Sequence, residues 1–150
     1  MNGYYSIVSE IRDYIKSLGL VNTVTIGDIY DVDLDKQTIF PLTHIISNNA
    51  QLTQSQIILN LSILFMDIVD ESKEQRINVF DGNDNELDVL NTQLAIANRF
   101  TNEVLRGDYF NNYDIIGTPT AEPFVDRFEN KIAGWTLTFD IAVPNDMTVC

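Results

Sequence analysis

The stretch that decides the fold reads Ile57-Ile58-Leu59-Asn60-Leu61-Ser62-Ile63-Leu64-Phe65-Met66-Asp67-Ile68-Val69. Its apolar density and its short polar interruptions predict one long β-strand. Successive side chains of a strand point to opposite faces of a sheet. One face therefore carries Ile57, Leu59, Leu61, Ile63, Phe65 and Val69. We expect this face to line the core.

The second face of the same strand is more apolar than a solvated face of a monomer. Asn60 and Ser62 interrupt it, but it also carries Ile58, Leu64, Met66 and Ile68. A neighbouring subunit or element is therefore expected to cover it, and these four residues are interface candidates. Strands usually span about 5 to 6 residues, so part of this one is expected to project beyond the body of the domain.

Composition indicates one soluble domain over residues 1–150. The chain has 9 Lys and Arg against 22 Asp and Glu, a formal net charge of −13. Such a chain repels phosphate, so tight nucleic-acid binding is not expected. No signal sequence or apolar run of about 20 residues occurs, so we expect no membrane segment. The single cysteine, Cys150, excludes an intrachain disulfide and a thiolate metal cluster.

The first half of the chain predicts a helix followed by strands. Apolar residues from Ile7 to Leu18 recur at spacings of three and four, and Gly19 suits a left-handed helix end. Strands are predicted over 21–26 and 42–47, with 28–37 as strand or turn. The polar residues 48–51 predict a connection to the long strand.

The second half predicts another helix and a final strand. The helix stripe consists of Leu87, Leu90, Leu94, Ala97, Thr101 and Leu105, widened by Val89, Ile96 and Phe100. Gly117, Pro119 and Pro123 predict an irregular link, with strand from 124 to 132. Alternation from Trp135 to Val143 predicts the last strand, packed against Leu87, Leu90 and Leu94. The fold class is thus α+β, with an antiparallel sheet and two helices packed on one face.

The residues predict no catalytic, cofactor or metal site. Asp31, Asp33 and Asp35 have the spacing that opens a calcium loop, but Lys36 and Leu42 stand where glycine and glutamate belong. His44, the only histidine, lies in a predicted strand and is expected to be structural. We therefore expect no enzymatic activity, although a carboxylate pair of the kind that hydrolases use remains an alternative.

Two further groups of residues are candidates for contacts. Tyr109, Phe110 and Tyr113 have no basic neighbours and are interpreted as packing or interface residues. Acidic side chains in predicted turns are candidates for a channel wall or a solvent-facing surface. They are Asp31, Asp33, Asp35, Asp81 and Asp84.

Three stretches of the chain resemble a small virion protein family of tailed phages that infect Bacteroidetes, including crAss-like phages. They are the end of the long strand from Met66 to Lys73, the acidic loop and helix ending Asn98-Arg99-Phe100, and residues 134–150. The element order also resembles tail-terminator and head-to-tail joining proteins. The resemblance implies a structural virion protein without enzymatic activity, made in the bacterial cytoplasm.

The sequence thus favours a ring-forming neck or tail-completion subunit. The ring would be a homo-oligomer, on the order of six or twelve subunits, that contacts portal, neck or tail proteins and passes DNA through its channel. Besides the hydrolase, a monomeric adaptor that binds by adding a strand to an open sheet edge is an alternative.

Overall fold

A computed structural model describes residues 4–27, 39–69, 86–106, 113–127 and 131–144. The predictions made for 28–37, for the acidic turns at Asp81 and Asp84, and for Tyr109 and Phe110 lie outside these residues. The helices are α1 (Tyr4–Ser17) and α2 (Glu86–Arg106). The strands are β1 (Thr23–Ile26), β2 (Leu42–Leu52), β3 (Gln56–Ile68), β4 (Asp114–Arg127) and β5 (Lys131–Pro144).

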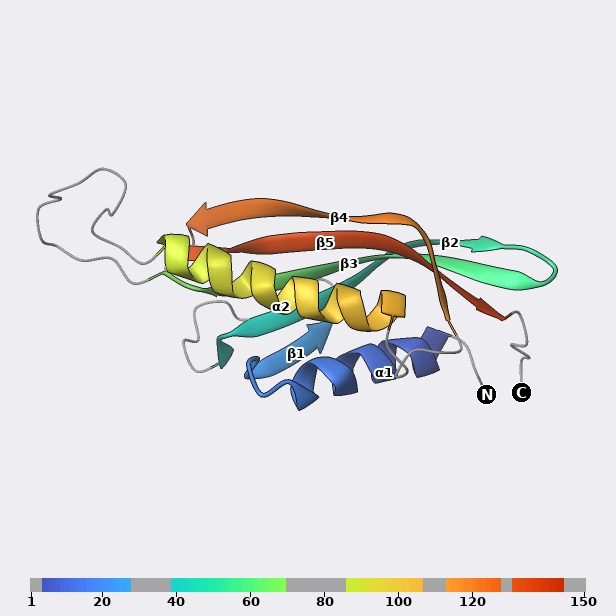
Figure 1. The fold of residues 1–150 in the computed structure, drawn as a ribbon, viewed down its shortest axis with the longest axis horizontal. Coiled ribbons are helices and arrows are strands. Elements are labelled where there is room, and N and C mark those ends of the chain that lie inside the picture. The colour runs from blue at the N-terminus through green and yellow to red at the C-terminus, as the bar shows by residue number, and fades with distance from the viewer. Residues whose placement is uncertain (1–3, 28–38, 70–85, 107–112, 128–130, 145–150) are drawn as a thin grey trace, which may run out of the picture.

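The five strands form one sheet in the order β1-β2-β3-β5-β4 (Figure 1). The pairs β2–β3, β3–β5 and β4–β5 are antiparallel, and the short β1 runs parallel to β2. The long strand predicted from residue 57 is β3, at the centre of the sheet. The predicted α+β class with a largely antiparallel sheet is confirmed, and β1 and β4 are the outermost strands within the described residues.

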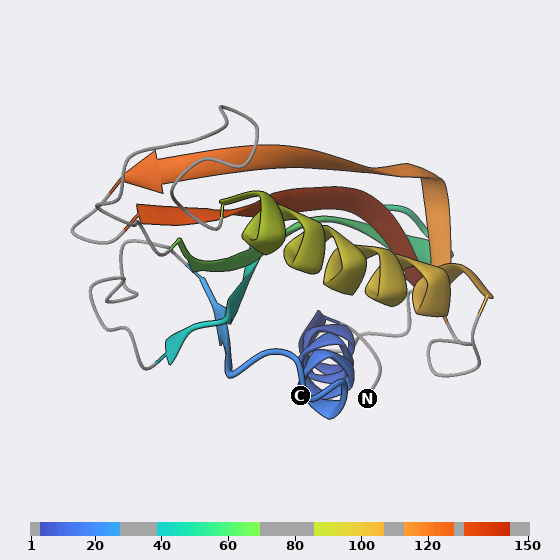
Figure 2. The ribbon, with the colours of Figure 1, turned by 60° about the vertical axis from the view of Figure 1, so that its left-hand side comes forward.

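Both helices lie on the same side of the sheet (Figure 2). Helix α2 crosses β5, β3 and β4, whereas α1 lies by β1. The core between helices and sheet contains Ile7, Ile11 and Ile15 of α1, Ile96 and Phe100 of α2, and the alternating β3 residues Ile57, Leu59, Leu61, Ile63 and Phe65. The predicted core face of β3 is therefore confirmed.

Helix α1 forms and ends as its sequence predicts. Ile7, Ile11 and Ile15 recur every four residues and are fully buried, so one stripe of the helix faces the sheet. Gly19 follows the helix with φ of 70°, and its N–H donates to the carbonyl of Lys16 at 3.2 Å. Glycine adopts this left-handed conformation without the Cβ penalty of other residues, which explains why the helix stops here.

The predicted stripe of α2 is buried in part, at Ala97 and at the widening residues Val89, Ile96 and Phe100, but the helix is rotated away from its leucines. Leu87, Leu94 and Leu105, which were expected to face the core, are exposed. The buried residues are Val89, Gln93, Ile96, Ala97, Phe100 and Val104. The helix has two apolar stripes, and the one with the bulkier Phe100 faces β3 and β5. Only Leu90, which is half-buried, keeps the predicted contact, since Trp135 Nε1 donates to its carbonyl at 2.8 Å.

Gln93 is a buried polar residue in the core-facing stripe of α2. Its side chain is 1% exposed, and its Oε1 has no hydrogen-bond partner among the described residues. Burying such a group without a partner costs roughly 1 to 3 kcal/mol. We therefore expect Gln93→Leu to raise the free energy of unfolding by about 1 kcal/mol. Urea denaturation measures the change, with exposed Asn98→Leu as the control, and a destabilised Gln93→Leu variant would contradict it.

Strand β2 extends through the residues 48–51 that were predicted to be a connection. It pairs with β3 as far as Leu52, with a register shift between Ser47 and Asn49. The Asn48 side-chain amide donates to Asn60 Oδ1 and to Ser62 Oγ, both at 2.8 Å. These cross-strand bonds supply partners for polar residues inside a strand, which explains why the polar segment does not become a turn.

Strand β4 also replaces a predicted irregular link. Gly117 and Pro119 lie within it, between Ile116 and Thr120, where the pairing with β5 shifts register. Gly117 has φ of 74°, which glycine tolerates. Proline lacks the N–H that a central strand needs, but in the part of the sheet that the structure describes β4 is an edge strand with β5 as its one neighbour. The glycine and prolines therefore mark a bulged edge strand rather than its end.

Candidate functional site

One exposed apolar surface is a stripe of leucines along α2. Leu87, Leu94 and Leu105, which we call the leucine stripe, are spaced by 7 and 11 residues, so they lie on one side of the helix. Their side chains are 52%, 38% and 49% exposed. Val125 of the edge strand β4 is 41% exposed as well. Helix α2 packs against β4, so the leucine stripe and Val125 lie on two elements that contact each other.

The surface around Leu94 and Leu105 lacks exposed acidic side chains of α2, whereas Leu87 lies between Glu86 and the exposed Asp88. Between Asn91 and Leu105 the exposed residues of α2 are Asn91, Thr92, Leu94, Ala95, Asn98, Arg99, Asn102 and Leu105. None of these is Asp or Glu, in a chain that has 22 of them. A hollow lined by Asn91, Leu94, Ala95 and Asn98 lies here. Charged residues are depleted in the central part of protein interfaces, and this helix face has that composition.

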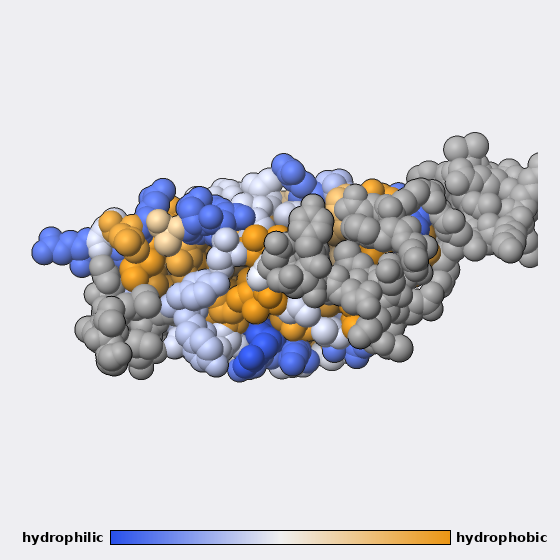
Figure 3. Space-filling view, turned by 180° about the vertical axis from the view of Figure 1, so that it is seen from behind, coloured by the Kyte–Doolittle hydropathy of each residue, from blue (hydrophilic) through white to orange (hydrophobic). Residues whose placement is uncertain are grey.

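A second apolar surface lies at the other edge of the sheet. An open groove of about 160 Å³ separates α1 from β1. Its lining, which we call the α1–β1 groove, consists of Tyr4, Tyr5, Val8, Ser9, Arg12, Val24, Thr25, Ile26 and Ile45. Tyr5 is 78% and Ile26 49% exposed. Figure 3, the view from behind, shows apolar residues at the surface among hydrophilic ones on this side of the molecule.

The floor and one wall of the α1–β1 groove are held by packing and hydrogen bonds. Ile45 of β2 is buried in the core. Tyr4 Oη and Ser47 Oγ are 2.6 Å apart, which ties the start of α1 to β2. The groove is therefore a formed feature of the fold.

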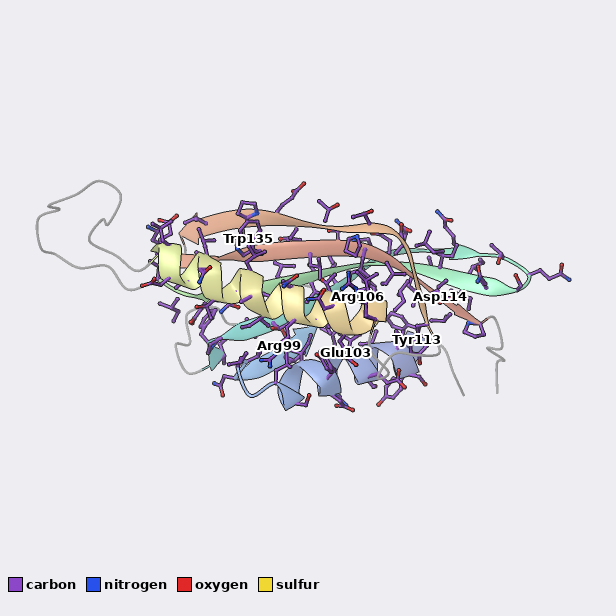
Figure 4. The ribbon with its side chains drawn as sticks, in the orientation of Figure 1. Arg99, Glu103, Arg106, Tyr113, Asp114 and Trp135 are labelled. Carbon is purple, nitrogen blue, oxygen red and sulfur yellow. The ribbon has the colours of Figure 1, made fainter. Side chains whose placement is uncertain are left out.

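The side of α2 that faces α1 differs from the leucine stripe because it is charged. Arg99 and Glu103 project from it (Figure 4). The ring centroids of Phe100 and Tyr14 are 6.2 Å apart. Burial, and then the Glu103 carboxylate, raise the pKa of the Tyr14 phenol, whereas Arg99 acts in the opposite direction. Phe100 and Tyr14 thus join the two helices beside this side of α2.

The interface candidates on the second face of β3 do not form one open patch. Met66 is buried with Phe40, Leu42 and Ile132 of the same chain. Leu64 and Ile68 are half-buried against this cluster, and Ile58 is half-buried at the other end of the strand. Other residues of the same chain therefore cover part of the second face of β3, which was expected to be covered by a neighbouring subunit or element.

Polar residues occupy the middle of that second face. Asn60 Nδ2 donates to Asp140 Oδ1 at 2.8 Å, and the hydroxyl oxygens of Ser62 and Thr138 are 3.1 Å apart. This polar network therefore divides the second face of β3 into two apolar parts, with Ile58 on one side and Leu64 and Met66 on the other.

The remaining sequence candidates fall inside the core or outside the described residues. Tyr113 is 6% exposed and belongs to the main core cluster, so of the two predicted roles, packing or interface, it has the packing role. Tyr109 and Phe110 lie outside the described residues. The acidic candidates Asp31, Asp33, Asp35, Asp81 and Asp84 lie outside them too.

His44 joins two strands by both ring nitrogens. It is fully buried, with Nδ1 2.6 Å from Thr25 Oγ1 and Nε2 2.8 Å from the carbonyl oxygen of Gly27. Because the carbonyl oxygen only accepts, Nε2 donates to it, and Nδ1 shares a hydrogen bond with the Thr25 hydroxyl. The predicted structural role of His44 agrees with these contacts, which hold β1 beside β2.

Other kinds of site find little support in the residues that the structure describes. Within them, no cluster of three or more His, Cys, Asp or Glu side chains has a metal-binding arrangement. Neither described helix has the length and apolarity needed to cross a bilayer. No carboxylate lines the α1–β1 groove or the hollow beside Leu94. A further small hollow between α2 and β4, at Val104 and Ile115, also has no carboxylate in its lining.

Sequence reasoning missed both exposed apolar surfaces. The signal for the leucine stripe was present, because α2 has more apolar residues than one core-facing stripe requires. The α1–β1 groove has no comparable signal, since Tyr4, Val8 and Ile26 come together only when α1 lies against β1. No protein-family model matches this chain, and a search of curated proteins finds no match.

Proposed function

We propose that this protein is a structural virion component that forms a ring at the head-to-tail junction or the tail end of a tailed phage. The resemblance of the chain to small virion proteins of Bacteroidetes phages supports the proposal. The α+β fold, with a largely antiparallel sheet and two helices on one face, agrees with it. In this role the protein connects portal or neck proteins to the tail and performs no chemistry.

The observation that carries the proposal is the presence of two different apolar surfaces on different elements of the fold. The α1–β1 groove lies beside β1, and the leucine stripe lies on α2, which packs over β5, β3 and β4. A subunit with two unlike contact surfaces binds its copies head to tail, and such contacts close into rings when the rotation between subunits permits it. A two-fold dimer would need only one of these surfaces.

The net charge of the chain supports a role in which DNA passes the protein without binding to it. A net charge of −13 repels the phosphate backbone, so a ring of such subunits lets DNA pass without retaining it. Purified protein is expected to show no DNA retention even at low salt. Micromolar affinity for duplex DNA near physiological salt would contradict this part of the proposal.

Copy number in the particle tests the proposal. Virions of a phage that encodes this chain are purified and their proteins quantified by mass spectrometry. The protein is expected in a copy number within about twofold of the portal subunit, as two rings on a common axis require. Its absence from virions, or a copy number close to that of the capsid or tail-tube subunit, would overturn the proposal.

The open sheet edges also support the adaptor alternative. Strands β1 and β4 each have one neighbour within the described part of the sheet, so either edge can accept an added strand. An adaptor of this kind stays monomeric until its partner binds. The oligomeric state of the isolated protein therefore separates it from the ring.

A further inference from the structure

We infer that the outer half of strand β2 pairs with the same segment of a second copy of this chain, as antiparallel strands related by a two-fold axis at Ala50. Strand β1 pairs with β2 only over Leu42–Ile45, whereas β2 continues to Leu52 beside β3. Within the described residues, the stretch Ile46–Leu52, which we call the distal edge, therefore has a partner strand on one side only. The β2–β3 hairpin that carries it extends past both helices at one end of the sheet (Figure 1). The inference goes beyond the proposed function and does not rest on it.

The main-chain groups of the distal edge point outward at alternate residues. The N–H of Thr53 donates to the carbonyl of Gln56 at 2.9 Å, so the main chain of Thr53 faces β3 at the hairpin turn. Because successive residues of a strand turn these groups to opposite sides, Leu52 and Ala50 turn theirs away from β3. A row of such outward N–H and C=O groups is a template for pairing with another strand.

The two outermost strands of the described sheet have features that disfavour strand addition, and the distal edge has none of them. Strand β1 is only four residues long. Strand β4 contains Pro119 and Pro123, which have no N–H, and the exposed carboxylates of Asp114 and Glu122. Proteins protect the edges of sheets with short strands, prolines and charges of this kind. Residues 46–56 include neither a proline nor a charged side chain.

The distal edge is its own complement. Two identical strands that are related by a two-fold axis pair antiparallel, and the same patch of both subunits then forms the contact. With the axis at Ala50, the smallest side chain of the distal edge lies opposite its copy, and the two residues exchange main-chain hydrogen bonds. Asn49 then lies opposite Gln51 of the partner subunit, and the same contact occurs again on the other side of the axis. Side-chain amides both donate and accept, so these pairs are mutually satisfied.

The same register covers apolar side chains that a single chain exposes. Leu52 is 77% exposed and lies on the helix side of the sheet, because it pairs with the core residue Ile57. Tyr4 Oη is 2.6 Å from Ser47 Oγ, so the exposed Tyr4 lies on this side at the inner end of the distal edge. An axis at Ala50 brings each Leu52 toward the Tyr4 side chain of the other copy. The contact thus covers both side chains of both subunits.

The charge and the size of the distal edge set the strength of the pairing. Each copy carries −13, but residues 37–66, which include the whole hairpin, contain no Asp, Glu, Lys or Arg. Asp114 and Asp140 lie on β4 and β5, beyond β3 as seen from the distal edge. Seven strand residues span about 23 Å, and a contact of this length buries less than the about 800 Å² per partner of a standard interface. We therefore expect a dissociation constant on the order of micromolar or weaker.

Single cysteines in a Cys150→Ser background test the position of the axis. Ala50→Cys places two thiols opposite each other with Cα atoms about 5.5 Å apart, within the range that a disulfide bridges. Two copies of Asn49→Cys are offset along the strands by two residues, so their Cα atoms are roughly 7 to 8 Å apart and too far for a disulfide. The same holds for Gln51→Cys. Gln54→Cys, in the exposed hairpin turn, is the control for random collision.

The full-length variants are checked for folding by circular dichroism, oxidised with oxidised glutathione and separated on a non-reducing gel. We expect Ala50→Cys to form a covalent dimer of twice 17.0 kDa on the order of tenfold faster than Gln54→Cys. Asn49→Cys alone and Gln51→Cys alone should react at the control rate. A 1:1 mixture of these two variants should form the mixed dimer on the order of tenfold faster than the control, because their cysteines lie opposite each other.

Other results overturn the inference in distinguishable ways. Equal rates at all four positions would show that the dimers arise from collision. A covalent dimer of Asn49→Cys or Gln51→Cys, with none of Ala50→Cys, would place the axis elsewhere. If Ala50→Cys links to a different protein in virions but not to its own copy, the distal edge accepts a foreign strand. The ring is judged separately, since a dimer through Ala50 that grows no further supports the pairing and contradicts the ring.

Discussion

Truncation of Phe100 to alanine is expected to lower the free energy of unfolding by about 3 to 5 kcal/mol. Phe100 is 1% exposed and lies where four elements meet. Its ring centroid is 6.2 Å from that of Tyr14 in α1, 6.4 Å from Phe65 in β3 and 5.8 Å from Phe139 in β5. Its removal takes away buried area and these ring contacts together. The loss is a large fraction of the roughly 5 to 15 kcal/mol by which a small domain is stable.

Urea denaturation of purified Phe100→Ala measures the effect, and insoluble or unfolded protein counts as the extreme of the expected result. Leu52→Ala is the control, since it removes a leucine side chain from a 77% exposed position on the β2–β3 hairpin. The control should change the free energy of unfolding by about 0.5 kcal/mol or less. Equal destabilisation by both variants would show that the core stripe of α2 is assigned wrongly.

Gly134→Ala is expected to lower the free energy of unfolding by about 3 kcal/mol or more, which is large for the addition of one methyl group. Gly134 is buried in β5 opposite Met66 of β3. A Cβ on it would overlap the carbonyl oxygen of Phe65 and lie 2.9 Å from the Cα of Met66. Both are backbone atoms of the central strand, so relief requires β3 and β5 to separate where they pair.

Gly117→Ala provides the comparison, because it adds the same methyl group in open space. A Cβ on Gly117 meets no atom within 4 Å, and the substitution is opposed only by its φ of 74°. That strain amounts to roughly 1 to 2 kcal/mol. Thermal or urea unfolding of both variants should show the larger loss for Gly134. A Gly134→Ala variant as stable as Gly117→Ala would mean that β3 and β5 are farther apart at this point.

The long apolar strand and its core face were predictable because the alternation of side chains along a strand indicates which of them face the core. Strand β3, the first helix with its end at Gly19, and the α+β class follow from local patterns of this kind. The parallel pairing of β1 with β2 does not, since no local pattern gives the direction of a neighbouring strand.

The errors arise where two local patterns compete or where tertiary contacts override one. Helix α2 has two apolar stripes, and the sequence alone does not state that Phe100, rather than Leu94, faces β5. The asparagines at 48–49 predict a turn until Asn60 and Ser62 are placed opposite them. The prolines of β4 predict a link until the strand is known to lie at an edge. The groove at Ile26 depends wholly on how α1 packs.

Native mass spectrometry of the purified full chain tests most directly the claim that copies of this protein meet through two unlike surfaces. Head-to-tail contacts that close give one species of fixed stoichiometry, a whole multiple of the 17.0 kDa chain, which persists on dilution to concentrations near the dissociation constant. The account predicts that species, with subunits arranged in a ring. A monomer at every concentration, or a dimer that never grows further, would contradict it.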